Sequence, residues 1–141
     1  MTILVSACLL GLCTRYDGGA KAHEGVLRLA EKHTLVPVCP EQLGGLATPR
    51  PPAEIQKDGR IVNKEGLDVT APFHLGAELA LSICRLSRCE AAILKARSPS
   101  CGLGMVYDGS FSGTLTKGSG VFAALCMGNG IRVYTEESRP E

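Results

Sequence analysis

Continuous apolar runs alternate with amphipathic stretches along the chain, and the two patterns predict different elements. The first run, 2–7, lacks the polar alternation of a strand with one solvated face, so it predicts a parallel strand that is covered on both faces. Two more apolar runs, 35–38 and 91–94, predict further strands, and 131–134 predicts a fourth. Each of the first three runs ends at or shortly before a cysteine.

Between these runs, apolar residues recur at the spacing of one helix face. From Ala22 to about His33 they oppose charged residues on the other side, which predicts an amphipathic helix. Pro72 suits a first helical turn, and the spacing up to about Ser87 predicts a second helix. We expect the buried stripe of that helix to consist of Leu75, Leu79, Ile83 and Leu86.

Turn-forming residues dominate the rest of the chain. The connection 40–70 is rich in glycine and proline as far as Asp68, so we expect no regular helix there but a lid over the strand ends. Asp58-Gly59 predicts a hairpin inside it, and a second hairpin is predicted at 105–111. Ser119 is a candidate cap for a helix from Val121, and we expect the tail 136–141 to be loose.

Strands that alternate with helices predict an α/β fold. We expect a single domain, 1–141, with a mainly parallel Rossmann-like sheet of about four strands, flanking helices and inserted hairpins. A chain of 141 residues can bury a sufficient core without disulfides or metals. Ligands of such sheets bind at the carboxyl ends of the strands.

Composition narrows the function. The 15 basic and 14 acidic residues leave a net charge of +1, which gives no electrostatic footprint for a nucleic acid and favours a small substrate. No apolar run reaches the roughly 18 residues of a membrane span, and the start is too short for a signal peptide, so a cytoplasmic protein without membrane contact is expected. Seven cysteines, an odd number, indicate ligand or catalytic thiols in a reducing compartment.

Three cysteines share one position relative to the predicted strands. Cys8 and Cys39 directly follow their strands, and Cys101 follows its strand after a short turn. Because the carboxyl ends of parallel strands meet at one edge, the three thiols are expected to converge. Three thiolates suit an iron–sulfur cluster with one open iron, or a catalytic zinc. Histidine is the usual complement for zinc, and none of the three histidines is expected near the strand ends.

The other four cysteines do not share this position. Cys84 and Cys126, on apolar helix faces, and Cys89, in a short connection, are expected to be packing residues, whereas Cys13 is left open. A non-catalytic metal- or thiol-binding module and a zinc-dependent enzyme acting on a small substrate remain alternatives. A hydrolase with a cysteine nucleophile would need a histidine beside its thiol, and none is near in sequence.

Over nearly its whole length the chain resembles the thiouracil desulfidase family, which was formerly a domain of unknown function. Six motifs in the same order carry this resemblance. They are Ser-Ala-Cys-Leu-Leu-Gly at 6–11, Arg-Tyr-Asp-Gly at 15–18, Pro-Val-Cys-Pro-Glu at 37–41, Gly-Gly-Leu at 44–46, Pro-Arg at 49–50, and Leu-Lys at 94–95 with Arg-Ser-Pro-Ser-Cys-Gly at 97–102.

The resemblance implies a [4Fe-4S]-dependent desulfidase that removes sulfur from thiouracil, a thiolated pyrimidine, to give uracil and sulfide. The family holds its [4Fe-4S] cluster with three cysteines, a role that maps onto Cys8, Cys39 and Cys101, and the fourth iron has no protein ligand. The implied partners are a small thiolated nucleobase and the iron–sulfur assembly machinery. Many relatives carry a cysteine where this chain has Thr14, so the resemblance assigns no role to Cys13.

The implied chemistry is attack of water on a thiocarbonyl carbon that an open iron has made electrophilic. Glu41, two residues beyond Cys39, is the expected base. We favour Ser98 over Ser100 as the catalytic serine that orients substrate or water, and Ser100 is then a substrate-binding residue. Basic residues are expected to hold an oxo group of the substrate or to offset cluster charge. They are Arg15, Arg50, Lys95 and Arg97.

Overall fold

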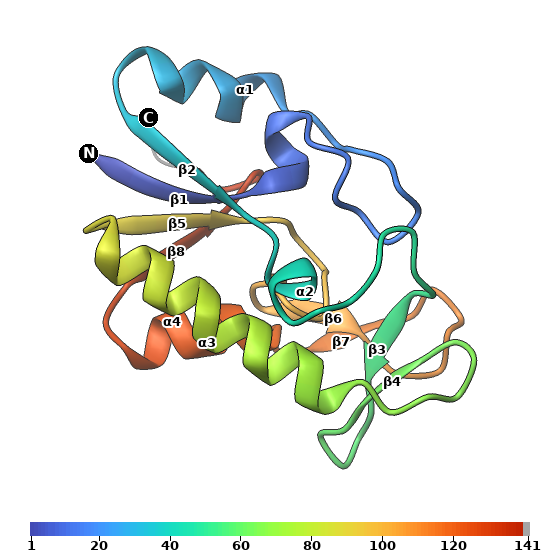
Figure 1. Cartoon of the computed structure of the whole chain (residues 1–141). Coiled ribbons are helices and arrows are strands. Elements are labelled where there is room, and N and C mark those ends of the chain that lie inside the picture. Colours follow the sequence, from blue (N-terminus) through green and yellow to red (C-terminus); the bar gives the residue numbers. More distant parts are fainter. Residues whose placement is uncertain (140–141) are drawn as a thin grey trace.

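A four-stranded parallel sheet forms the centre of the computed structural model, which describes residues 1–139 (Figure 1). Its strands are β1 (Thr2–Ser6), β2 (Thr34–Val38), β5 (Ala91–Leu94) and β8 (Arg132–Thr135), in the order β2-β1-β5-β8. All neighbouring pairs run parallel. The prediction of an α/β fold with a mainly parallel sheet is therefore confirmed.

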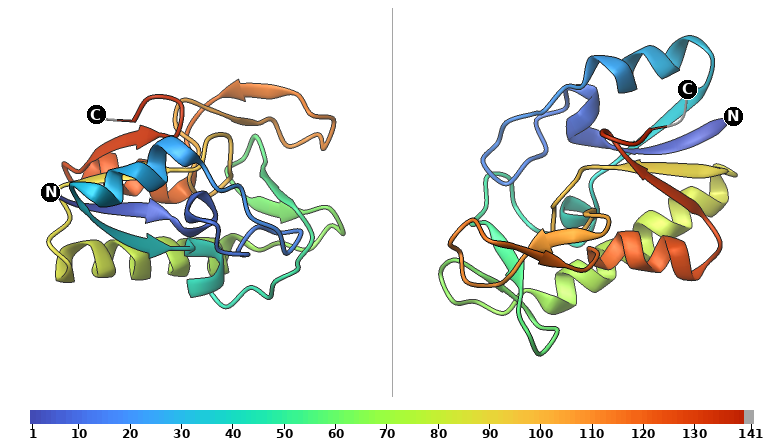
Figure 2. Two further views of the ribbon diagram at one scale, coloured as in Figure 1. Left: turned by 90° about the horizontal axis from the view of Figure 1, so that it is seen from above. Right: turned by 180° about the vertical axis from the view of Figure 1, so that it is seen from behind.

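Helices cover both faces of this sheet (Figure 2). The long helix α3 (Thr70–Leu86) and α4 (Val121–Gly128) lie on one face. On the other face lie α1 (Glu24–Leu27) and the 3-10 helix η2 (Arg28–Glu31), which replace the single longer helix that the sequence predicted. Burial on both faces explains why the inner strands β1 and β5 are apolar without alternation.

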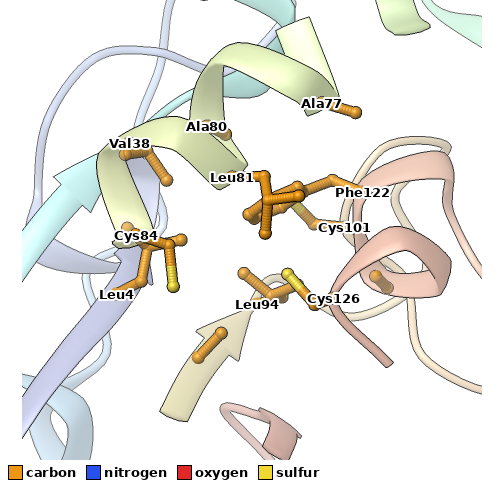
Figure 3. Packing of buried hydrophobic residues seen from close by; sticks show 12 residues of the cluster. Leu4, Val38, Ala77, Ala80, Leu81, Cys84, Leu94, Cys101, Phe122 and Cys126 are labelled. Atoms are coloured by element: carbon orange, nitrogen blue, oxygen red, sulfur yellow. The ribbon is translucent and has the colours of Figure 1, made fainter. Parts of the chain in front are cut away.

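A hydrophobic core lies between the sheet and the helices α3 and α4 (Figure 3). Leu4 from β1, Leu81 from α3 and Phe122 from α4 are each at most 3% exposed. Cys84 and Cys126 are packed among them, which confirms their prediction as packing residues. Burial raises the pKa of Cys126 to about 12, so this thiol stays protonated and apolar.

The buried stripe predicted for α3 is wrong. Leu75, Leu79 and Leu86 are 52%, 40% and 85% exposed, and Ile83 is only partly buried. Close packing against α2 (Pro40–Leu43) requires small residues at the contact, because Gly76 lies directly against the backbone of that helix. Small residues therefore occupy much of the face where leucines were expected. The buried residues of α3 are Phe73, Gly76, Ala77, Ala80, Leu81 and Cys84.

The connection 40–70 contains more regular structure than expected. The single turn α2 begins at Pro40, which corrects the expectation of no helix, because proline is well suited to a first helical position. The strands β3 (Ala53–Ile55) and β4 (Ile61–Asn63) form the predicted hairpin around Asp58-Gly59. No helix among residues 1–139 is long and apolar enough to cross a bilayer.

A second hairpin follows the turn that carries Cys101. Its strands are β6 (Met105–Tyr107) and β7 (Leu115–Lys117), which confirms a hairpin that begins at Met105. The second strand lies beyond the predicted bounds of 105–111, so the connecting loop is longer than expected. Ser119 is not the cap of α4, which corrects that prediction: Gly120 is the N-cap, and Ser119 Oγ accepts a hydrogen bond from the Gly104 N–H at 3.2 Å. This contact ties the end of the hairpin to its start.

The close contact between α2 and α3 gives a test of the fold. A Cβ on Gly76 would overlap the carbonyl oxygen of Pro40, so Gly76→Ala must displace α2. We expect the substitution to lower the free energy of unfolding by about 1–3 kcal/mol in chemical denaturation. Gly128→Ala is the control, because nothing lies within 4 Å of its added Cβ. Equal stability of the two variants would contradict the close packing of α2 on α3.

Candidate active site

A cavity of about 380 Å³ lies at the carboxyl ends of β1, β2 and β5. This is where α/β sheets bind their ligands, and the volume lies within the range of about 300–1,000 Å³ that is usual for small-molecule sites. Every site residue predicted from the sequence lines this cavity. These residues are Cys8, Cys39, Cys101, Glu41, Ser98, Ser100, Arg15, Arg50, Lys95 and Arg97.

The three strand-end thiols meet in this cavity. Cys8 lies in the 3-10 helix η1 (Ala7–Leu10) directly after β1, Cys39 is the N-cap residue of α2, and Cys101 lies in the turn after β5. Burial raises the pKa of Cys8 to about 11 and that of Cys101 to about 12, and it also raises the pKa of Cys39. At neutral pH these thiols are protonated, so a metal centre would displace their protons on binding.

The donor set fits a cluster better than a single ion. Among residues 1–139, no group of three or more histidine, cysteine or acidic side chains is close enough to hold one metal ion. A zinc site requires all ligands within about 2.0–2.3 Å of one atom. An iron–sulfur cluster instead binds each thiolate to a different iron, so its thiolates stand farther apart. Cys8, Cys39 and Cys101 come from three separate elements and line one cavity, so each could bind a different iron.

A chain of hydroxyl groups connects the turn of Cys101 to Glu41. Ser98 Oγ accepts hydrogen bonds from the N–H groups of Ser100 (3.2 Å) and Cys101 (3.1 Å), which fixes this turn. Ser100 Oγ donates to Glu41 Oε2 at 2.9 Å, lies 3.0 Å from Ser98 Oγ and is 3.6 Å from Cys101 Sγ. Ser98 thus shapes the turn, and Ser100 is the serine that contacts Glu41.

Arg50 holds the other oxygen of Glu41. Its Nε donates to Glu41 Oε1 at 3.0 Å, and the side chain of Arg50 is only 6% exposed. The remaining N–H groups donate to the Thr14 carbonyl (2.9 Å) and to Thr48 Oγ1 (2.8 Å). One of its nitrogens also lies 3.9 Å from Cys39 Sγ. Arg50 therefore orients Glu41 and places positive charge beside a ligand thiol.

Lys95 is held beside the cavity by the end of the chain. Its Nζ pairs with Glu136 Oε2 at 3.0 Å, while Glu136 Oε1 accepts the Ala96 N–H at 2.8 Å. Burial alone would raise the pKa of Glu136, but the hydrogen bonds from Ala96 and Lys95 outweigh it and hold that pKa below its usual range. Glu136 is 7% exposed, so the expectation of a loose tail is wrong there. Residues 140–141 of that tail lie outside the described residues.

The cavity also has aromatic residues that were not predicted from the sequence. Tyr16, Tyr107 and Phe111 all line it. The guanidinium of Arg15 lies 5.7 Å from the centre of the Tyr16 ring, a cation–π contact. The sequence held only a weak signal for this role, because an aromatic residue at a predicted hairpin tip belongs to no helix or strand whose spacing would show which way it faces. Cys13, by contrast, is exposed and does not line the cavity.

Comparisons with known proteins agree with this site. A family model described as 2-thiouracil desulfurase matches residues 3–138. The uncharacterized protein YbbK of Bacillus subtilis (strain 168) is 43% identical over 143 residues, which cover 95% of each protein. A solved structure described as the [4Fe-4S]-dependent thiouracil desulfidase TudS matches with a TM-score of 0.90 and 46% identity, over 96% of this chain and 91% of that one.

The Lys95–Glu136 pair predicts a pH-dependent stability. Glu136→Gln should lower the free energy of unfolding at pH 7 by about 1–3 kcal/mol, because it removes a buried charge-assisted hydrogen bond. Since the folded pKa of Glu136 is lowered, the parent's advantage is complete above the unfolded value of about 4.3 and lost as pH falls through the folded value. Urea unfolding at several pH values measures this. A difference that persists undiminished in acid would contradict the ion pair.

Proposed function

The chain belongs to the 2-thiouracil desulfurase family, and we propose that it is a [4Fe-4S]-dependent enzyme that converts thiouracil to uracil and sulfide. One observation carries this proposal: three strand-end thiols and an anchored carboxylate line the same cavity. A module that only bound metal would not need a carboxylate fixed at both oxygens beside the thiols.

Cys8, Cys39 and Cys101 are the proposed cluster ligands. No other cysteine of the described residues lines the cavity, so one of four irons would lack a protein thiolate. When bound, such a cluster supplies a Lewis-acidic iron with high affinity for the thiocarbonyl sulfur. The charges of Lys95 near Cys8 and of Arg50 near Cys39 oppose the effect of burial on both thiols and so favour their ligating thiolate forms.

Glu41 is the proposed general base. Arg50 fixes its Oε1 and Ser100 donates to its Oε2, so the carboxylate has one orientation in the cavity. A carboxylate oxygen has two acceptor sites, and Oε2 can therefore accept a water proton while it keeps the Ser100 hydrogen bond. Ser100 is then the serine that orients the base. Ser98 supports it by holding the turn, and Ser98 also lines the same cavity.

The cavity favours a small free base as the substrate. Its volume of about 380 Å³ must hold both a cluster and the substrate. The net charge of +1 offers little attraction for a tRNA, as the sequence already indicated. Of the four predicted basic residues, Arg15 has the longest ion pair, 3.9 Å to Asp17, and we propose that it holds an oxo group of the base.

Replacement of the ligands tests the cluster assignment. Cys8→Ser, Cys39→Ser and Cys101→Ser should each lose most of the iron and acid-labile sulfide after anaerobic reconstitution, and with it the brown colour. Cys13→Ser and Cys126→Ala are controls for an exposed and a buried thiol and should retain both. Full iron content in the Cys101 variant, or a colourless parent with stoichiometric zinc, would overturn the assignment.

Replacement of the base tests the reaction. Glu41→Gln keeps the size of the side chain and a partner for Arg50 but accepts a proton poorly. Uracil release under anaerobic conditions should fall by about 10²- to 10⁴-fold, the usual loss for a general base, with iron content unchanged. Glu65→Gln, an exposed acid on the β4 side of the molecule, is the control and should match the parent. Turnover of Glu41→Gln within a few fold of the parent would exclude this role.

A further inference from the structure

The tip of the β6–β7 hairpin holds an aromatic residue in an unfavourable backbone conformation. Phe111 has a φ of 56°, in the left-handed region that bulky residues rarely adopt. Such conformations persist only where surrounding contacts fix them, and they are concentrated at ligand-binding and active sites. The contacts that fix Phe111 therefore need an explanation.

A carboxylate of the other hairpin fixes this tip. Glu54 on β3 accepts two backbone hydrogen bonds on Oε1, from Gly109 at 3.0 Å and from Phe111 at 3.1 Å. Gln56 Nε2 donates to the Gly109 carbonyl at 3.2 Å, which adds a third bond between the two hairpins. The hairpins lie side by side, with β3 against β6, although more than forty residues separate them in sequence (Figures 1 and 2). Glu54 thereby holds the loop that carries Phe111.

The position of Phe111 suits contact with a ligand. Phe111 lines the cavity together with Tyr107, and its side chain is only partly buried, so it is not a core residue. The thiols, Ser100 and Glu41 make the part of the cavity at the strand ends polar, whereas the hairpin contributes aromatic surface. A flat heterocycle with one reactive polar edge matches both parts, because every such ring has a π-face that stacks on an aromatic side chain.

We propose that Phe111 is the stacking platform for the pyrimidine ring of the substrate and that Glu54 is its positioning residue. The proposal rests on the proposed desulfidase function and adds a basis for specificity. The site selects planar heteroaromatic thiocarbonyl compounds over aliphatic thioamides that would present the same sulfur without a π-face. Loss of one stacking contact is expected to weaken binding by roughly 5- to 150-fold.

Fluorescence tests the contact directly, because the chain contains no tryptophan. Phe111→Trp places a single reporter at the platform of the cluster-loaded protein. We expect thiouracil to quench it in a saturable manner, at concentrations near the KM. Leu115→Trp on β7 is the matched control, since it lies on the same hairpin but does not line the cavity, and it should show only the non-saturable loss due to light absorption. Equal quenching curves for the two reporters would overturn the proposal.

Kinetics separate a stacking role from a merely structural one. Phe111→Leu should raise KM for thiouracil by roughly 5- to 150-fold with unchanged iron content, whereas Phe111→Tyr, which keeps the ring, should retain the parent's KM. Glu54→Gln should also raise KM. The double variant Phe111→Leu with Glu54→Gln should raise KM by less than the product of the two single effects. A KM within twofold of the parent for Phe111→Leu would overturn the role of Phe111.

If the loaded parent releases uracil from thiouracil while the Phe111 variants behave like it, the desulfidase function stands and the stacking platform is rejected. If the loaded parent releases no uracil at all, the function itself is rejected, and the platform with it.

Discussion

The shared carboxyl edge of β1, β2 and β5 is the constraint on which the site depends. β1 pairs with both neighbours in parallel, with Ser6 opposite Val38 and Val5 opposite Ile93. This register brings the residues that follow each strand to the same edge of the sheet. Three thiols from distant parts of the sequence thus reach one cavity without any long-range motif. The buried apolar strands supply the rigidity, since they cannot shift without moving their core residues.

Polar contacts then convert a shared edge into an oriented site. Hydrogen bonds from Arg50 to Glu41 and from Ser100 to Glu41 connect the segment after β2 with the turn after β5. The ion pair between Lys95 and Glu136 connects the residue that follows β5 with the residue that follows β8. Both ion pairs lie at the cavity rather than in the core. Burying charged groups is costly, and their place beside the thiols indicates that they also serve orientation and charge at the site.

Local pattern and one topological rule were sufficient to predict the strands and the convergence of the thiols. They did not predict the buried face of α3, because the close approach of α2 at Gly76 is a tertiary contact that local periodicity does not encode. Glu136 was missed for a related reason: its position beside Lys95 follows from the pairing of Thr135 with Leu94. Phe111 depends on contact between two hairpins far apart in sequence.

We propose that three protein thiolates hold a cluster and leave one of its irons without a protein ligand. Mössbauer spectroscopy of protein loaded anaerobically with isotopically enriched iron tests it most directly, with and without thiouracil. We expect three similar iron sites and one distinct site, and only the distinct site should respond to thiouracil. Four equivalent iron sites whose spectra do not change with thiouracil, or iron bound as isolated ions, would contradict this assignment.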